Sequence, residues 1–356
     1  MKANEMIRSC SLTLLVVILC TVALELYWRG KGFVATFNDD KVLWSTKRKE
    51  VYLPATEATV FVGGSRIKFD LDVPTWEKLT GEKAIQLAIV GTPARLILRD
   101  LANDKNFKGK VIIDVAEGQF FSFPDSAQRD RFAREALQYY YDETPAQRAS
   151  ASINHFLESK LVLLEEGKFS LTSLLDKLNI SNRPGVQPRP YTFTPREFGV
   201  SNFNRQSWLT PMFLADSGLQ KKQKDFWALG IKRATPIKGD TLHAFLEQTK
   251  KAIDKIRNRG GLVAFIRPPS DGPYIEMENR LYPRQKYWDY LLEYTTTPGI
   301  HYADYPGTAN LICAEWSHLT LQDAAMYTAQ LVKILQEEKN WTFPKKTNAT
   351  AQFLNP

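Results

Sequence analysis

Short apolar segments alternate with helical segments along much of the chain, and this alternation constrains the fold more than any other feature. ATVFVGG (58–64), KAIQLAIVG (83–91) and GKVIIDVAEG (109–118) are apolar runs that end in glycine, as buried parallel strands often do. Helical patterns lie between them at 74–79 and 92–104. This β-α-β-α-β order predicts an α/β fold with a doubly wound parallel sheet, in which ligands bind beyond the carboxyl ends of the strands.

The alternation returns in the second half of the chain, after a stretch of different character. From about residue 120 to 235, helical segments alternate with segments rich in proline and arginine, which no simple βα unit explains. We interpret this stretch as a large, mainly helical insertion that borders the site. The later elements are expected as a helix at 240–260, a strand at 261–269, a helix at 278–295, a strand at 299–306 and a helix at 321–338. One α/β domain is therefore predicted at 55–338, followed by a tail at 339–356.

An apolar segment near the N-terminus has the length and composition of a membrane helix. Residues 7–28 contain an uninterrupted apolar and small-polar core, and Tyr27 and Trp28 stand where interfacial aromatic residues are common. A cleaved signal peptide is the alternative, but no small-x-small cleavage site follows the core. We expect an uncleaved anchor, with a cytoplasmic stub and the membrane helix at 1–29 and a linker and docking segment at 30–54.

Charges beside this segment barely favour one orientation. Lys2 and Arg8 precede it, while Arg29 and Lys31 follow it. We expect the body of the protein outside the cytoplasm, because nothing else in the sequence explains a lone N-terminal anchor. The chain would then be a single-pass membrane protein of the periplasm or cell surface.

Charge and cysteine content argue against several other classes of protein. The net charge is +8, but basic residues are spread along the chain and mixed with acidic ones, so we expect no nucleic-acid partner. Of the three cysteines, Cys10 and Cys20 lie in the apolar segment, which leaves Cys313 alone in the rest of the chain. Neither a disulfide framework nor a cysteine metal site is available, and we expect no metal and no cofactor.

His318 has the sequence surroundings of a catalytic residue. It lies in CAEWSHLTLQDA, a loop after the last predicted strand, and the next helix begins with the capping-box spacing of Thr320 and Asp323. Glu315, three residues before His318, can fold back to bond one imidazole nitrogen and leave the other to accept a proton.

A hydroxyl that His318 could activate lies at the end of the first predicted strand. Ser65 follows two glycines there and is expected to be exposed, and the first and last βα loops of one sheet can meet. The backbone N–H groups of Ser65 and of Gly91, whose missing side chain permits close approach, could stabilise a developing oxyanion. Each fragment also has an ordinary explanation, because GGS is a common loop composition and a glutamate three residues before a histidine often occurs by chance.

Together, GGS ending at Ser65, Gly91 after the second strand, and ExxH from Glu315 to His318 resemble the sequence blocks of the SGNH/GDSL hydrolase superfamily. The resemblance implies a flavodoxin-like doubly wound sheet. It implies Ser65 as nucleophile and first oxyanion donor, and Gly91 as second donor. It also implies His318 as general base, oriented by the Glu315 carboxylate.

The sequence departs from the family pattern in three blocks. Gly64 stands where the family has the aspartate of its GDS motif, and Glu315 stands where it has the aspartate of its D-x-x-H motif. The segment DVAEGQFF at 114–121 has no counterpart of the asparagine that acts as third oxyanion donor. Its Glu117 would repel an oxyanion, unless the carboxylate points away or meets a cation.

Two arginines near the predicted strand ends have two open interpretations. Arg66 and Arg267 could bind an anionic or sugar substrate at the rim of the site, or they could form ordinary salt bridges.

The leading hypothesis is a membrane-anchored, extracytoplasmic serine esterase or O-acyltransferase that works through an acyl-enzyme. Anchored SGNH-like proteins of polysaccharide O-acetylation and lipoteichoic acid D-alanylation are similar in layout. This similarity implies an acylated cell-envelope glycan or lipid as substrate, and envelope acyl-transfer proteins as partners. The alternative is a catalytically weak or inactive SGNH-like binding or assembly protein of the envelope.

Overall fold

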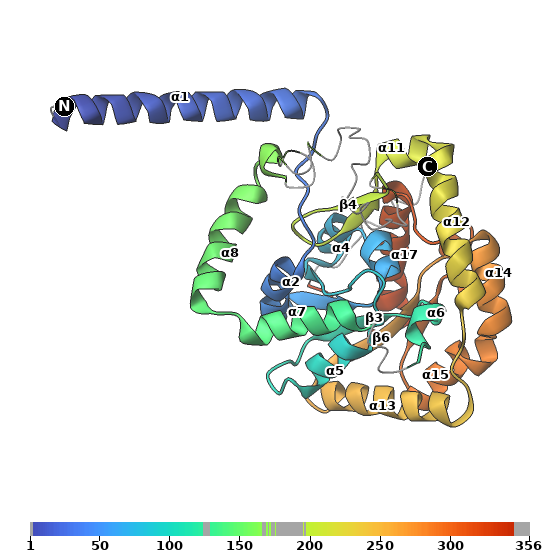
Figure 1. The fold of residues 1–356 in the computed structure, drawn as a ribbon. Coiled ribbons are helices and arrows are strands. Elements are labelled where there is room, and N and C mark those ends of the chain that lie inside the picture. Colours follow the sequence, from blue (N-terminus) through green and yellow to red (C-terminus); the bar gives the residue numbers. More distant parts are fainter. Residues whose placement is uncertain are drawn as a thin grey trace, which may run out of the picture.

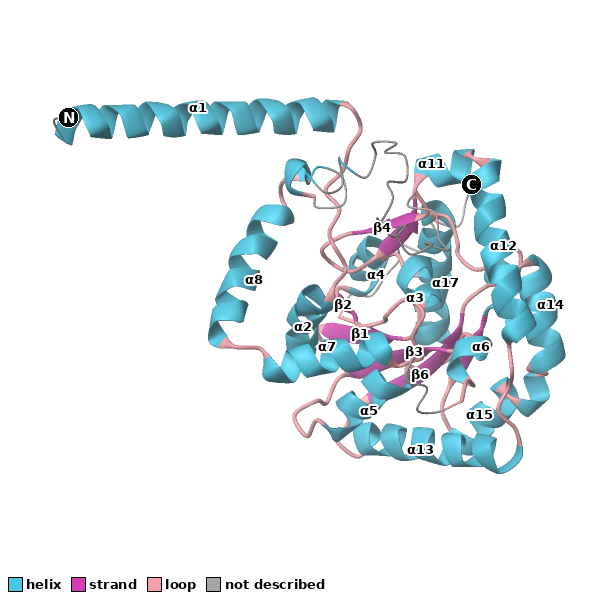
Figure 2. Ribbon diagram, in the orientation of Figure 1, coloured by secondary structure: helices cyan, strands magenta, loops and turns pink. Residues whose placement is uncertain are grey.

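The computed structural model describes residues 3–123, 129–165 and 197–344, and the single positions 169, 171, 175 and 195. Its centre is a parallel sheet of five strands in the order β2-β1-β3-β6-β7 (Figure 2). The strands are β1 (Ala58–Val62), β2 (Lys83–Gln86), β3 (Lys110–Asp114), β6 (Leu262–Arg267) and β7 (Gly299–His301). The strand order reverses between β1 and β3, which is where sheets of this kind bind their ligands. The predicted α/β class with a parallel sheet is confirmed.

Helices cover both faces of the sheet, because successive side chains of a buried strand point to opposite faces. One face packs against α5 (Arg95–Asn103), α13 (Gly239–Arg257) and α15 (Trp288–Thr295). The other packs against α3 (Ser65–Asp70), α4 (Val73–Thr80) and α17 (Leu321–Glu337). In β1, Val60 belongs to the first core and Phe61 to the second. The sheet therefore lies between two helical layers.

The second strand ends earlier, and the helix after it begins later, than the sequence predicts. β2 ends at Gln86 rather than at Gly91, and α5 begins at Arg95 rather than after an N-cap at Thr92. Gly91 has a φ of +71°, and Thr92 N donates to Ile89 O (3.1 Å). The chain therefore makes a turn before the helix can start, and this turn was predicted as strand and helix.

Pro283 breaks the single helix predicted over 278–295. α14 (Gly272–Leu281) ends before it, and α15 begins after the 3-10 turn η3 (Arg284–Lys286). Proline lacks the N–H that a helix interior needs, and its ring clashes with the preceding turn. The last strand is also shorter than predicted, because η4 (Tyr302–Asp304) and α16 (Pro306–Ala309) follow it directly.

The final helix agrees closely with the sequence prediction. α17 begins at Leu321, and Thr320 Oγ1 accepts a hydrogen bond from Asp323 N (3.2 Å) as the capping spacing predicts. This cap fixes the start of the helix, and with it the loop that carries His318.

Further elements surround the two layers. They are α2 (Lys41–Lys49), η1 (Glu50–Tyr52), α6 (Glu117–Phe120), α7 (Arg131–Asp142), α8 (Pro145–Glu158), η2 (Val162–Leu164), the antiparallel pair β4 (Gly199–Ser201) and β5 (Ser207–Leu209), α11 (Pro211–Ala215) and α12 (Ser217–Arg233). The described part of the predicted insertion is thus mainly helical. Most of its proline-rich stretch, 181–194, lies outside the described residues.

The segment predicted as linker and docking segment contains α2, which packs into the body. Trp44 is buried, and its Nε1 donates to Leu87 O (3.0 Å). Arg48 is also buried and forms ion pairs with Asp100 and Asp104, each at 2.7 Å. These contacts fasten the chain to the body soon after the apolar N-terminal segment.

The apolar segment forms α1 (Ala3–Gly30), which projects from the body (Figure 1). It is long and apolar enough to cross a membrane, a property that a signal sequence near the N-terminus shares. Large apolar side chains along it, such as Leu12 and Leu19, are exposed. α1 is therefore not a core helix of the body.

Candidate functional site

Glu315 and His318 meet in the loop before α17. His318 Nδ1 lies 2.7 Å from Glu315 Oε1, and both side chains are fully buried. Between them Trp316 has a φ of +80°, a left-handed backbone that turns the chain sharply. Since an ionised carboxylate only accepts hydrogen bonds, the imidazole proton belongs on Nδ1 and the lone pair on Nε2. The hydrogen bond expected from the ExxH spacing is present.

Aromatic rings enclose this pair. The His318 ring centroid lies 4.5 Å from that of Phe69, 5.6 Å from that of Phe198 and 6.0 Å from that of Trp227. The Trp227 indole N–H also donates a hydrogen bond to Glu315 Oε2. His318 Nε2 is buried and has no hydrogen-bond partner in the described part of the chain. A lone pair in an apolar enclosure is the group a general base needs once a substrate hydroxyl or Ser65 reaches it.

Ser65 is the first residue of α3, directly after β1 and the two glycines. The sequence predicted an exposed serine, but its exposed fraction is 7%. An added Cβ at Gly63 would lie 2.3 Å from Asp114 Cβ, so only glycine fits between β1 and the end of β3. This close approach turns the chain into α3 and buries its first residue.

Contacts between α3 and the loop before α17 place Ser65 and His318 in one region. Phe69, one turn after Ser65, packs on the His318 ring, and Leu319 N donates to Asp70 Oδ1 (2.9 Å). None of the hydrogen bonds among the described residues joins Ser65 Oγ to His318 Nε2. The structure thus brings the two predicted residues to the same helix and loop without a hydrogen bond between them.

Glycine is required at position 91 and at position 64 for different reasons. Gly91 is exposed, and a Cβ there would meet nothing within 4 Å, so its positive φ rather than close packing requires glycine. At Gly64 a Cβ would lie 2.1 Å from Gln119 Oε1 and 3.6 Å from Thr92 O. The close approach that the sequence suggested for Gly91 is therefore found at Gly64.

Gln119 is a site residue that the sequence prediction missed. It lies on α6, in the DVAEGQFF segment that has no asparagine, and its carboxamide rests against the backbone just before Ser65. A side-chain amide carries two N–H donors. The available signal was an amide two positions after Glu117, within the block where the family has its own amide donor.

Two arginines and two glutamates, Arg66, Arg267, Glu117 and Glu278, form a buried Arg-Glu cluster behind Ser65. Arg267 Nε donates to Glu117 Oε1 (3.0 Å), and its Nη2 donates to Glu278 Oε2 (2.6 Å). Arg66 Nη2 donates to Glu278 Oε1 (2.6 Å), and its Nη1 lies 3.9 Å from Glu117 Oε2. All four side chains have exposed fractions of 7% or less. Of the two interpretations of these arginines, ion pairing is the one observed, and neither guanidinium lies at a rim.

The cluster also settles where the Glu117 carboxylate points. Burial raises the pKa of Glu117, while the Arg267 guanidinium acts to lower it. Burial acts in the same direction on Glu278, but Arg66 and Arg267 hold its pKa below the usual value. Glu117 therefore meets two cations, and its charge is balanced rather than directed at an oxyanion.

Asp114 supports the turn before Ser65 from the end of β3. Its Oδ2 accepts a hydrogen bond from Gly64 N (3.1 Å). The side chain is buried, and burial raises the pKa of Asp114 to about 6. Its protonation therefore changes in the weakly acidic range, beside the turn that precedes Ser65.

Among the residues that the structure describes, no group of three or more His, Cys, Asp or Glu side chains is placed to hold a metal ion. No family model matches the sequence, and no curated protein matches it. The likeness to SGNH hydrolases therefore rests on the residues described above.

Proposed function

We propose that the chain is a membrane-anchored serine esterase or O-acyltransferase whose body lies outside the cytoplasm. The observation that carries the proposal is the buried Glu315–His318 hydrogen bond, held against the helix that begins with Ser65. A carboxylate that fixes one imidazole nitrogen and leaves the other unpartnered is the arrangement of a general base. The SGNH assignment of the fold is part of this proposal.

In the proposed reaction, Ser65 Oγ attacks the ester carbonyl and His318 Nε2 takes the serine proton. His318 then gives this proton to the leaving alcohol, and the acyl group stays on Ser65. Water or a sugar hydroxyl attacks the acyl-enzyme, loses its proton to His318 and releases the acyl group, after which the proton returns to Ser65. The mechanism requires Ser65 Oγ to come within about 3 Å of Nε2 in the substrate complex.

Three donors are proposed for the oxyanion of the tetrahedral intermediate. They are the backbone N–H groups of Ser65 and Gly91 and the side-chain amide of Gln119. The contact between Gln119 and Gly64 places the carboxamide beside the turn that precedes Ser65, with Oε1 toward Gly64, so the proposal requires the amide to turn its NH₂ group to the oxyanion. The pairing of Glu117 with arginine supports the third donor, because it removes a repelling charge from the same helix.

The proposed substrate is an acylated glycan or lipid of the cell envelope, with envelope acyl-transfer proteins as partners. The likeness to anchored SGNH proteins and the apolar helix α1 support this class. The competing proposal is a binding or assembly protein without turnover, which the missing Ser65–His318 hydrogen bond and the aromatic enclosure of His318 favour.

Hydrolysis of p-nitrophenyl acetate by the full chain in detergent separates the two proposals. Ser65→Ala and His318→Ala should each lower kcat by at least about 10³-fold. Ser217→Ala and His243→Ala, both at exposed positions, should leave it unchanged. Wild-type protein without activity above buffer, or hydrolysis that survives both site substitutions, would favour the binding protein.

A further inference from the structure

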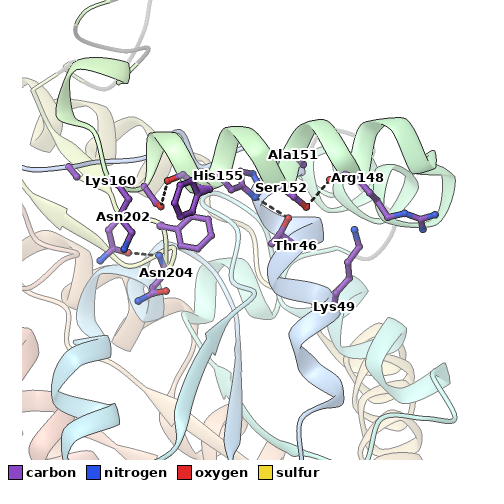
Figure 3. A pocket seen from close by; sticks show the side chains of 13 residues that line it. Thr46, Lys49, Arg148, Ala151, Ser152, His155, Lys160, Asn202 and Asn204 are labelled. Carbon is purple, nitrogen blue, oxygen red and sulfur yellow. Dashed lines mark hydrogen bonds between the residues drawn. The ribbon is translucent and has the colours of Figure 1, made fainter. Parts of the chain in front are cut away.

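A cavity of about 900 Å³ lies away from the candidate site, between α8, α2 and the connection from β4 to β5 (Figure 3). Its lining includes Lys49 on α2, Arg148 and Ser152 on α8, Lys160 just after α8, and Asn202 and Asn204 between β4 and β5. The lining includes none of the residues of the proposed reaction. The cavity therefore needs an explanation of its own.

The lining of the cavity is positively charged and therefore favours an anionic ligand. Lys49, Arg148 and Lys160 contribute three cations, and none of the described lining residues is acidic. Lys49 is paired with Glu143, whereas the Arg148 and Lys160 side chains are exposed and form no ion pair with any residue that the structure describes. A ligand with a negative group would be drawn to this wall, because nearby cations stabilise it electrostatically.

The neutral groups of the lining also present donors. Asn202 Oδ1 already accepts from Asn204 N (2.9 Å) and Gln206 N (3.2 Å). Asn204 Oδ1 accepts from Lys47 Nζ (3.3 Å). Since both amide oxygens are occupied, the two NH₂ groups remain to donate to a ligand. A phosphate, which has only acceptor oxygens when doubly esterified, matches such a wall.

The size and apolar part of the cavity indicate more than a free ion. Ala35, Ala151, Phe156 and Phe203 provide apolar surface beside the cations. The cavity has the volume of a site for an organic molecule rather than for a single phosphate. Its ligand should therefore join a phosphate to an organic group with apolar parts.

The cavity adjoins the end of the apolar helix α1. Arg29 Nη2 donates to the carbonyl of Lys160 (2.7 Å), a residue that lines the cavity. Glu25 accepts from Val162 N (2.9 Å) and Leu163 N (3.1 Å), just beyond it. Where α1 crosses a membrane, these contacts hold the cavity at the membrane surface, where anionic headgroups are concentrated.

α8 carries the exposed side chains of a helix that lies at a membrane surface. Ile153 and Phe156 are 63% and 68% exposed, so apolar side chains project from the helix that carries Arg148 and Ser152. Helices with apolar and basic residues of this kind lie at membrane interfaces. We propose that the cavity binds the phosphate-bearing headgroup of an anionic membrane lipid. This inference rests on the proposed membrane anchor, and not on the proposed ester chemistry.

The test measures binding of dihexanoylphosphatidylglycerol to the full chain in a non-ionic detergent by calorimetry. Dihexanoylphosphatidylcholine and inorganic phosphate serve as comparison ligands. Arg148→Gln with Lys160→Gln should weaken phosphatidylglycerol binding at least about 10-fold. The two cations lie at opposite ends of the cavity (Figure 3), so the phosphate loses a charge-assisted hydrogen bond to one of them and the longer-range attraction of the other. Lys251→Gln with Lys255→Gln, on α13, removes the same charge elsewhere and should change the affinity less than about 2-fold.

A second variant fills the cavity without changing its charge. Ser152→Phe should weaken phosphatidylglycerol binding and leave the fold intact, since Ser152 is exposed on α8. Ser65→Ala should bind the lipid as wild type does, so that failure of the ester chemistry and failure of this inference are told apart. Absence of phosphatidylglycerol binding, equal binding of free phosphate, or equal loss in the α13 control would each overturn the inference.

Discussion

The substitution Glu278→Gln tests whether the buried Arg-Glu cluster is structural. Glu278 accepts hydrogen bonds from Arg66, Arg267 and Ser270, each at 2.6 Å, and its side chain is 1% exposed. Glutamine keeps the shape but removes the charge, so two buried guanidinium groups share the single carboxylate of Glu117. Breaking a buried ion pair from one side costs about 3–5 kcal/mol. For a domain of this size that corresponds to a fall in Tm of roughly 6 °C or more.

The assay is thermal unfolding of the full chain in detergent, followed by circular dichroism, with ester hydrolysis measured on the same samples. Glu276→Gln is the matched control, because Glu276 is exposed on the same helix and should shift Tm by less than about 1 °C. The structural interpretation predicts a lower Tm and an unchanged KM for the fraction that stays folded. An unchanged Tm with a raised KM would mean that the arginines bind substrate, and the reasoning would be refuted.

Four further substitutions probe the surroundings of Ser65 and His318. Burial raises the pKa of Asp114 to about 6, above the value of about 3.9 in the unfolded chain. Between these values the folded state binds a proton that the unfolded state lacks, so the contribution of Asp114 to stability is present below pH 4 and lost above pH 6. Asp114→Asn should therefore gain stability relative to wild type by up to about 2–3 kcal/mol between pH 4 and 6; urea unfolding that gives a constant difference contradicts this. Gly64→Ala places a Cβ 2.1 Å from Gln119 Oε1. Gly64→Ala and Gln119→Ala should each lower kcat about 10²-fold or more. Full activity in Gln119→Ala would show that Gln119 is not an oxyanion donor. Trp227→Phe deletes the indole N–H that donates to Glu315 and should lower kcat about 10-fold with little change in KM. A fall in kcat together with a similar rise in KM would instead indicate that α12 is misplaced.

Sequence patterns predicted the elements that depend only on residues close together in the chain. Apolar runs that end in glycine predicted the strands, and the cap at Thr320 predicted the start of α17. The Glu315–His318 hydrogen bond also joins residues only three positions apart. At Pro283 the periodicity of apolar residues continues, but the helix breaks because proline has no N–H to donate.

The remaining parts of the site depend on contacts across the chain. Arg66 and Glu278 are 212 positions apart, and Trp227 and Glu315 are 88 positions apart. Neither pair leaves a periodic or motif signal, because each depends on how α14 or α12 packs in the folded protein. Whether Arg66 lies at the rim of the site or in a buried ion pair depends on Glu278, a partner far away in the sequence.

Labelling with a fluorophosphonate probe is the most direct test of the proposed nucleophile. The folded full chain should form one covalent adduct, which peptide mass spectrometry places on Ser65. Ser65→Ala should form none, and His318→Ala should react at least about 10²-fold more slowly, because its serine has no base. An unlabelled folded protein, or equal labelling of Ser65→Ala, would contradict the account.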